Sequence, residues 1–396
     1  MKKYGGNELN YLNKVLKNEK PKSGTWNREL ENQFSELFNA KYGIAMNSGT
    51  ATLHSALEAL GIKAGDEVIS PALTVIMNTT ATLHANAIPV YADVDEETFN
   101  VNAETIEKKI TKKTKAIMVV SLYGLPCDMK AIMKLGKKYK IPVIEDHAQT
   151  TLSKIGNKIV GVEGDFASWS FESSKHISSG EGGMLLTNNK KLAENARKIA
   201  GQGYANLTAD GGVIKFDNKS TILTPSFLRH DTLGWNYRMT EFTASIALAQ
   251  LEQVEEKVQQ RIHVANEFLE VIDSYEIIKP QFVPKGYTHS YFTLACTLED
   301  KNIKWENFRD KFIYFGGEGF YAAWQNPYNE PLMSNENYKT RNTGIYKNIS
   351  YKDTLNPVAE KLQKKIIQFK TNYLTNKEIT LQTKALDKTL KFFSQQ

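Results

Sequence analysis

The sequence has few cysteines. Only Cys127 and Cys296 occur among its 396 residues, and they lie far apart in the chain. Two distant cysteines neither build a disulfide framework nor give the paired spacing of a zinc site. The seven histidines also stand singly, without ligand spacing, so we expect no metal site. Such sparing use of cysteine fits a reducing compartment, and we expect a cytoplasmic protein.

Long apolar runs are missing as well. No run approaches the roughly 20 residues of a membrane-spanning helix, and the first residues lack the apolar core of a signal peptide. Charge of one sign is not concentrated either, because 50 basic and 44 acidic residues leave a net charge of +6 and the lysines are spread along the chain. We therefore expect neither a membrane protein nor a nucleic-acid binder.

Two phosphate-binding motifs are also absent. The chain contains no Walker loop and no G-x-G-x-x-G after its first strands. The second absence disfavours a nicotinamide-dependent oxidoreductase.

The first half of the chain does contain a regular alternation of apolar strands and helical segments. Strands are predicted at 67–70, 88–92, 116–120, 141–144, 166–171 and 184–186, and helices at 51–60, 76–86, 103–110 and 128–139. Continuous apolar strands separated by helices indicate a mostly parallel sheet covered on both faces. Ligands of such sheets gather at the carboxyl ends of the strands. The polar residues at or near these ends are Ser70, Ser121, Asp146 and Ser170.

A single lysine, Lys175, lies in a stretch rich in serine and glycine after the apolar run 166–171. The glycines that follow it, at 180, 182 and 183, let backbone or ligand approach closely. Burial and neighbouring positive charge lower the pKa of such an amine, which then reacts as a nucleophile and forms a Schiff base with an aldehyde cofactor. A surface turn with a solvated lysine has the same pattern, and this stretch alone does not separate the two interpretations.

A second polar cluster, Asn47-Ser48-Gly49-Thr50, immediately precedes the helical run 51–60. A helix start of this kind presents free N–H groups and the positive end of the helix dipole, which suits a phosphate. Ordinary capping by Ser48 or Thr50 explains the cluster equally well.

These stretches together resemble the motifs of the DegT/DnrJ/EryC1/StrS aminotransferases, pyridoxal-phosphate enzymes that mostly aminate nucleotide-linked keto-sugars. The matching segments occur in the family's order and span about half of the chain. They are Asn47-Ser48-Gly49-Thr50-Ala51-Thr52-Leu53, Tyr123-Gly124, Glu145-Asp146-x-x-Gln149, Ser170-Phe171-x-x-x-Lys175 followed by Gly180-Glu181-Gly182-Gly183, and Asn236-Tyr237-Arg238-Met239-x-Glu241.

The resemblance implies an aspartate-aminotransferase-like fold (fold type I): a large α/β domain with a mostly parallel seven-stranded sheet, and a smaller α+β domain. We expect the large, pyridoxal-phosphate-binding domain to span residues 15–255, and the small domain to combine residues 1–14 with 256–396. Because the family binds its cofactor at a dimer interface, we also expect a homodimer with shared active sites.

The resemblance also assigns roles to residues. Lys175 is expected to hold pyridoxal 5′-phosphate as a Schiff base and then to move a proton between substrate and cofactor. Asp146 is expected to keep the ring nitrogen protonated, with a helix-capping role as the alternative. The remaining cofactor contacts are expected from Gly49, Thr50, Val75, Gln149, Ser170 and, in the neighbouring subunit's site, Asn236.

The implied reaction moves an amino group from L-glutamate to a nucleotide-linked keto-deoxysugar in a ping-pong cycle. An alternative acceptor is a small keto phosphate such as glycerone phosphate. Two alternatives come from other classes: a sugar dehydratase, in which histidine replaces the lysine, and a non-catalytic regulatory protein. Lys175 disfavours the dehydratase, although His176 is the next residue.

Two positions depart from the family pattern. Val75 stands where the family usually has an aromatic residue that stacks on the cofactor ring, and a valine packs on a ring without stacking. Ser121 and Leu122 precede the Tyr123-Gly124 motif, where the family usually has His-Leu.

The remaining segments give coarser predictions. A long helix is expected over 240–268, strands at 275–280 and 289–296, and helices from there to the C-terminus. The run 316–324 is rich in glycine and aromatic residues, and either lines a pocket over the site or packs as a loop. Residues 204–233 are expected to form a long loop.

Overall fold

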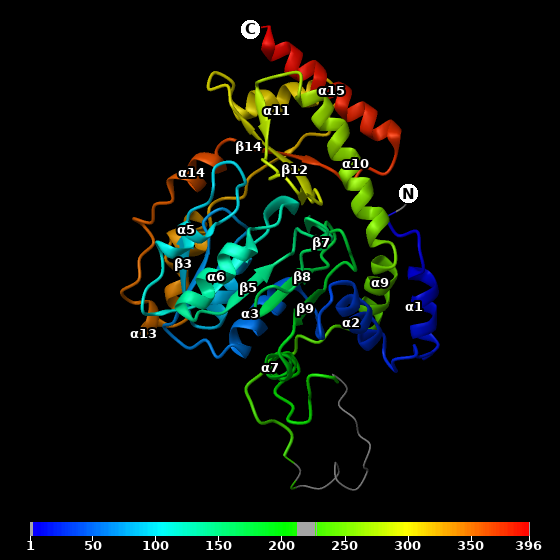
Figure 1. The fold of residues 1–396 in the computed structure, drawn as a ribbon, viewed down its shortest axis with the longest axis vertical. Coiled ribbons are helices and arrows are strands. Elements are labelled where there is room, and N and C mark those ends of the chain that lie inside the picture. Colours follow the sequence, from blue (N-terminus) through cyan, green and yellow to red (C-terminus); the bar gives the residue numbers. More distant parts are fainter. Residues whose placement is uncertain (1–2, 212–225, 227, 396) are drawn as a thin grey trace.

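The computed structural model describes residues 3–211, 226 and 228–395. Its centre is a seven-stranded sheet, and a smaller sheet lies at the end of the molecule that carries the C-terminal helix (Figure 1). In spatial order the strands of the large sheet are β1 (Tyr42–Met46), β9 (Gly183–Thr187), β8 (Phe166–Ser170), β5 (Val143–Asp146), β4 (Thr114–Val120), β2 (Glu67–Pro71) and β3 (Ile88–Ala92).

Within this sheet only β9 runs against the other strands, pairing antiparallel with both β1 and β8. The remaining pairs, from β8 through β5, β4 and β2 to β3, are parallel. The expected α/β fold with a mostly parallel seven-stranded sheet is therefore confirmed. Because parallel strands end at the same edge, Asp146 at the end of β5 and Ser170 at the end of β8 lie on that edge together.

Both faces of the large sheet are buried, because successive strand residues point to opposite sides. On β4, Ala116 and Met118 join the cluster under α3 (Gly49–Ala59) and α7 (Lys190–Ala200). Their neighbours Ile117 and Val119 join the cluster on the other face, under α5 (Ala103–Glu107) and α6 (Met129–Tyr139). Further along that second face lie α2 (Trp26–Leu37) and α9 (Glu241–Leu251).

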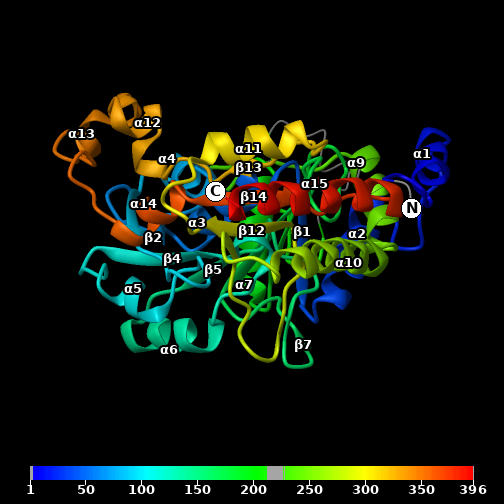
Figure 2. The ribbon, with the colours of Figure 1, turned by 90° about the horizontal axis from the view of Figure 1, so that it is seen from above.

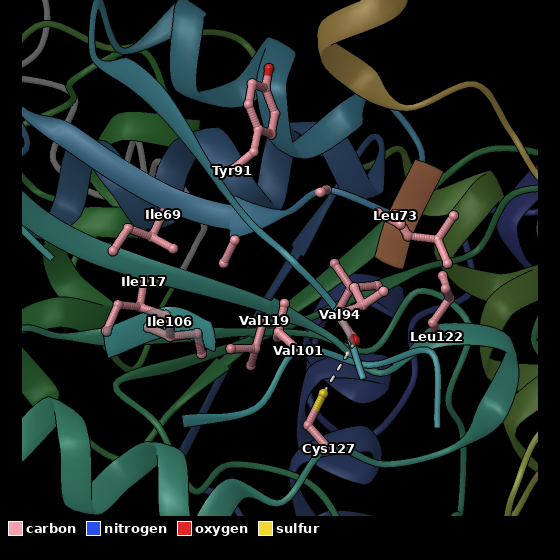
Figure 3. Packing of buried hydrophobic residues seen from close by; sticks show 14 of the residues in the cluster. Ile69, Leu73, Tyr91, Val94, Val101, Ile106, Ile117, Val119, Leu122 and Cys127 are labelled. Carbon is pink, nitrogen blue, oxygen red and sulfur yellow. Dashed lines mark hydrogen bonds between the residues drawn. The ribbon is translucent and has the colours of Figure 1, made fainter. Parts of the chain in front are cut away.

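Figure 3 shows the second face from close by, with Ile69, Ile117 and Val119 packed toward Ile106 of α5. Each such side chain contributes about 1.5–3 kcal/mol by leaving water. Cys127 belongs to the same cluster, and its thiol donates a hydrogen bond to the Val120 carbonyl at 3.2 Å. Both cysteines are buried and unpaired, so their role here is packing.

The smaller sheet is antiparallel throughout. Its order is β10 (Ile278–Pro280), β12 (Thr293–Leu298), β14 (Ile366–Lys370) and β13 (Tyr321–Ala322). It packs with α10 (Val254–Ile272), α11 (Trp305–Tyr314) and α15 (Asn376–Ser394). In Figure 1, α11 and α15 lie above the small sheet and α10 runs down beside it, and the three helices lie side by side in Figure 2. A minor sheet joins β7 (Lys158–Ile159), β6 (Lys154–Ile155) and β11 (Tyr287–Thr288).

Two expectations about the second half of the chain are wrong. The single helix expected over 240–268 is two helices, because α9 ends at Leu251 and α10 begins at Val254. The C-terminal part is not purely helical, because β13 and β14 complete the small sheet. Of the expected loop at 204–233, residues 212–225 and 227 lie outside the described part of the chain.

The segment between the small-sheet strands β13 and β14 returns to the large sheet. It contains α12 (Pro331–Ser334), α13 (Thr343–Tyr346) and α14 (Pro357–Gln363), and its aromatic residues join the core next to β2 and β3. Tyr346 and Tyr351 donate to the carbonyls of Ala87 and Pro89 at 2.9 and 2.8 Å. The predicted boundary at residue 255 stays a prediction, but this stretch packs against the large domain.

A buried ion pair joins α2 and α7 at the edge of the large sheet that β1 forms. The Arg197 guanidinium donates to both carboxylate oxygens of Glu31 at 2.9 and 3.1 Å, and to the Gly43 carbonyl at 2.8 Å. Both side chains are about 5% exposed. Removing one partner leaves the other buried and uncompensated, so we expect Arg197→Met to lower the free energy of unfolding by about 3–5 kcal/mol. Urea denaturation checks this value, and a loss below about 1 kcal/mol would contradict it.

Candidate active site

Asp146 is a buried carboxylate at the end of β5, only 3% exposed. The Asn78 amide donates to one of its oxygens at 3.1 Å and the Ala148 N–H donates to the other at 3.0 Å. Burial raises the pKa of this carboxyl, although both hydrogen bonds and the charge of Lys175 oppose the shift. The two hydrogen bonds fix the plane of the carboxylate, and within the described chain no cation forms an ion pair with it.

Lys175 lies in the turn between β8 and β9, where its own N–H donates to the Glu172 carbonyl at 3.0 Å. Its amine lies 4.5 Å from the centre of the Phe292 ring. Burial lowers the pKa of this amine, the negative charges of Asp146 and Glu172 oppose that, and the positive charge of Arg261 adds to it. The balance favours the neutral, nucleophilic form compared with a solvated lysine.

His176 is placed differently from its neighbour. Its side chain is 3% exposed, and Nε2 lies 3.0 Å from the Ser290 carbonyl. Burial and the charge of Arg261 hold its pKa well below the ordinary value. Its contact with Ser290 ties it to the backbone of the small domain, which leaves Lys175 as the reactive side chain of this turn.

Gly49 and Thr50 form the first turn of α3, and Ser48 caps it by accepting from the Ala51 N–H at 3.1 Å. In the described chain no group accepts from the N–H groups of Gly49 and Thr50. A Cβ on Gly49 would lie 2.8 Å from the Ser170 Cβ, so the helix start and the end of β8 are in close contact. Free N–H groups, a helix dipole and a hydroxyl thus converge where a phosphate would bind.

Gln149 follows the same edge, three residues after Asp146, and is 2% exposed. Its side-chain oxygen accepts the Tyr123 N–H at 2.8 Å, which turns the amide nitrogen away from that backbone. Across the described residues, no acceptor takes up this amide N–H2 group. Gln149 therefore offers a fixed, unused donor beside the carboxylate.

The structure gives less support to two of the expected cofactor residues, Val75 and Asn236. Val75 is half-buried in the loop between β2 and α4 (Met77–His84), the helix that supplies Asn78. Asn236 is exposed, and its carbonyl lies 3.4 Å from the Asn47 amide that donates to it. A role for Asn236 in a neighbouring subunit concerns an assembly, and it stays a prediction.

Three residues of this site were not predicted from the sequence: Asn78, Arg261 and Phe292. Asn78 stands at the start of the helical run 76–86, seven residues after the end of β2, and this position alone gives a signal for it. Arg261 and Phe292 come from the second half of the chain, where no motif marks them. Only the fold brings α10 and the start of β12 against the Lys175 turn.

A sequence model of the DegT/DnrJ/EryC1/StrS aminotransferase family matches residues 2–378 of the chain. The chain belongs to this family. Its members depend on pyridoxal phosphate, so the chain is a pyridoxal-phosphate-dependent aminotransferase, and the recognition made from the motifs is confirmed.

The chain is also similar to named relatives and to a solved structure. The chain is 37% identical over 312 residues to a GDP-perosamine synthase of Escherichia coli O157:H7, a match that covers 78% of this chain and 80% of the relative. A GDP-perosamine synthase of Vibrio cholerae is 32% identical over 314 residues, covering 78% and 79%. A solved aminotransferase from Psychrobacter cryohalolentis is 28% identical with a TM-score of 0.82, covering 98% of this chain and 96% of that one.

The residues of the site fit pyridoxal phosphate on structural grounds. Asp146 is a buried carboxylate suited to a cationic ring nitrogen, and the start of α3 offers unused N–H groups to a phosphate. Lys175 has a lowered pKa at the same sheet edge. Among the described residues, no helix combines the length and the apolar character needed to cross a membrane.

Proposed function

We propose that this aminotransferase transfers the amino group of L-glutamate to a nucleotide-linked keto-deoxysugar by a ping-pong mechanism, working in the cytoplasm as a homodimer with shared active sites. The observation that carries the catalytic assignment is that Lys175, whose pKa is lowered, lies within the electrostatic reach of the buried carboxylate of Asp146. The two buried, unpaired cysteines support a reducing compartment.

Pyridoxal phosphate, when bound, supplies an aldehyde for the lysine amine and a cationic ring that accepts electrons. Lys175 is the nucleophile that holds it, and after release the same amine takes a proton from the donor's α-carbon and returns one to the cofactor side. Asp146 would hold the ring nitrogen in its protonated form, because a fixed and buried negative charge stabilises a nearby cation.

The other side chains orient the ring. The N–H groups of Gly49 and Thr50 and the hydroxyl of Ser170 would hold the phosphate. The Gln149 amide would donate to the phenolic oxygen, and Val75 would pack on the ring. The anchored phosphate lies away from the reacting carbon, so its binding free energy fixes the geometry of the reaction.

Gly49→Ala tests the phosphate site. The new methyl group would lie 2.8 Å from the Ser170 Cβ, so either the helix start or β8 must shift. Overpacking of this kind costs about 1–3 kcal/mol, and we expect the dissociation constant for pyridoxal phosphate to rise roughly tenfold. Titration of the cofactor-free protein, followed by absorption, measures it.

Two further variants serve as controls for Gly49→Ala. Adding Ser170→Gly removes the Cβ that the new methyl group meets, so the double variant should recover the stability lost to overpacking, but not the full affinity, because it also lacks the hydroxyl proposed to bind the phosphate. Gly344→Ala, where the nearest atom is 3.6 Å away, should bind as the wild type does. Unchanged affinity in Gly49→Ala would place the phosphate elsewhere.

The acceptor class follows from the relatives. Two GDP-perosamine synthases each match more than three quarters of this chain at over 30% identity. We therefore propose a GDP-linked keto-deoxysugar as the first acceptor to test. A small keto phosphate such as glycerone phosphate remains the alternative acceptor for the same residues.

The proposed homodimer is supported by exposed apolar side chains near the site. Leu9 and Leu16 on α1 (Glu8–Leu16) are 72% and 71% exposed, and Phe242 on the adjacent α9 is 47% exposed. Exposed apolar side chains gathered on neighbouring helices indicate a protein interface.

The decisive experiment is an assay of the purified protein with pyridoxal phosphate, L-glutamate and GDP-, UDP- or dTDP-linked keto-deoxysugars. Replacement of the keto oxygen by an amine, detected by product mass, should match the amount of 2-oxoglutarate formed. Turnover of glycerone phosphate instead would select the alternative acceptor. Loss of water without glutamate would indicate a dehydratase, and cofactor binding without any turnover would indicate a regulatory protein.

A further inference from the structure

Arg261 is a buried arginine without an acidic partner. It lies on α10, the helix that runs from the large sheet to the small one (Figure 1), and is 8% exposed. In the described part of the chain, no carboxylate forms an ion pair with its guanidinium. Burying an unpaired charge is costly, and burial lowers the pKa of Arg261 to about 10.

The guanidinium instead donates to neutral oxygens of three different segments. One nitrogen donates to the Phe292 carbonyl at 2.7 Å and to the Thr371 hydroxyl at 3.2 Å. The other donates to the Ser174 carbonyl at 2.9 Å. Phe292 directly precedes β12 and Thr371 directly follows β14, so Arg261 fastens the peptide before Lys175 to the small sheet.

The same arginine lies close to the lysine amine. The Arg261 guanidinium carbon lies 5.7 Å from the centre of the Phe292 ring, and the Lys175 amine lies 4.5 Å from that centre. The Arg261 guanidinium and a protonated Lys175 amine would thus lie against the same aromatic ring and repel each other. This repulsion opposes the protonated form of the lysine and leaves the permanently charged arginine unchanged.

We propose that Arg261 is a positioning residue for Lys175: it holds the Ser174 carbonyl in place and keeps a fixed positive charge beside the lysine amine. The proposal rests on the proposed role of Lys175. It explains why the acceptors of this buried arginine are backbone carbonyls and a hydroxyl, since a carboxylate partner would cancel the charge that acts on the lysine.

Other groups act on the same amine and must be kept constant in a test. The negative charges near Lys175 are Asp146 and Glu172, and both raise its pKa. His176 faces Arg261 as well, but burial holds it neutral. Lys257 lies one helical turn before Arg261 on α10. Burial lowers its pKa to about 8, and the positive charge of Arg261 acts in the same direction, as it does on Lys175.

The test compares a neutral and a charged replacement in the full chain freed of cofactor. Arg261→Gln keeps amide donors but loses the charge, and Arg261→Lys keeps a charge but loses the planar fork. An acylating reagent labels neutral amines, and mass spectrometry follows the labelling rate of Lys175 against pH with Asp146 and Glu172 intact. A lysine in a short unstructured peptide serves as the reference.

In the wild type, labelling of Lys175 should reach its half-maximal rate at a lower pH than labelling of a lysine in a short unstructured peptide. In Arg261→Gln this midpoint should rise, and each unit of rise slows labelling about tenfold below the midpoint. Arg261→Lys should keep a midpoint near that of the wild type. Arg341→Met is the matched control, because Arg341 also donates to carbonyls, those of Leu83 and His84, without acting on Lys175.

Equal midpoints in Arg261→Gln and the wild type, with both proteins folded by circular dichroism, would overturn the proposal and leave a purely structural arginine. Should the glutamine variant not fold, Arg261→Met replaces it, because its apolar stem still packs against Phe292. Cofactor and substrate are absent from this measurement. A failure of the aminotransferase assay is therefore distinguishable from a failure of the arginine proposal.

Discussion

Lys175→Ala should lose covalent attachment of pyridoxal phosphate and at least about 10³-fold of the transamination rate. The amine is both the nucleophile that holds the cofactor and the base that moves the proton, and alanine supplies neither. The measurement is the absorption spectrum with added pyridoxal phosphate, followed by borohydride reduction and peptide mapping. Wild-type protein should carry the reduced cofactor on the peptide containing Lys175.

Lys257→Ala is the matched control for this prediction. Lys257 is the other lysine near Arg261 whose pKa burial lowers, to about 8, but its amine donates to the Lys3 carbonyl at 2.9 Å and to Gln250. A lysine with a lowered pKa but without Asp146 nearby is not expected to hold the cofactor. Lys257→Ala should therefore keep the covalent attachment. Recovery of the reduced cofactor on another lysine in the wild type would refute the role of Lys175.

The elements of the large sheet could be predicted because their signals are local. Apolar runs such as 116–120 are continuous where a strand is covered on both faces, and the polar residues that follow mark the ligand edge. Asp146 and Ser170 were found in this way, since parallel pairing makes strand ends coincide. Predicting which strand-end residues meet at this sheet edge therefore required no knowledge of distant contacts.

The second half of the chain was predicted less well because its structure depends on distant partners. β14 spans only Ile366–Lys370, and pairing with β12 and β13 makes it a strand. The break between α9 and α10 contains Glu252 and Gln253, with neither glycine nor proline to signal it. Arg261 was missed for the same reason, since its acceptors lie at Ser174, Phe292 and Thr371.

Asp146→Asn should keep the fold and the cofactor but lower the transamination rate by about 10³-fold. An asparagine oxygen can still accept the Ala148 N–H, and the Asn78 amide can turn so that its unpaired oxygen accepts from the new N–H2 group, so the side chain should stay in place. The neutral amide cannot stabilise a protonated ring nitrogen, and the ring then loses most of its ability to accept electrons from the substrate carbon. Single-turnover kinetics with L-glutamate measure this loss without needing the acceptor.

Stability separates this catalytic role from a structural one. Burial raises the pKa of the Asp146 carboxyl, so the folded protein binds the proton more tightly than the unfolded chain. The contribution of Asp146 to stability is therefore largest below the ordinary aspartate pKa and falls as the pH rises through the raised value. At a pH above that raised value the ionised carboxylate destabilises the cofactor-free fold, so there Asp146→Asn should melt no lower than the wild type.

Asp165→Asn provides the comparison for Asp146→Asn. Asp165 also accepts a backbone N–H, that of Val143 at 2.9 Å, at the opposite end of β5 from Asp146. Its variant should retain the wild-type rate with glutamate. A large loss of melting temperature in Asp146→Asn, with an unchanged rate, would make Asp146 a structural cap. Asn78 and Ala148 fix the carboxylate in a buried position that lowers the stability of the fold. Stabilising the cationic ring nitrogen explains such a carboxylate better than a structural role does.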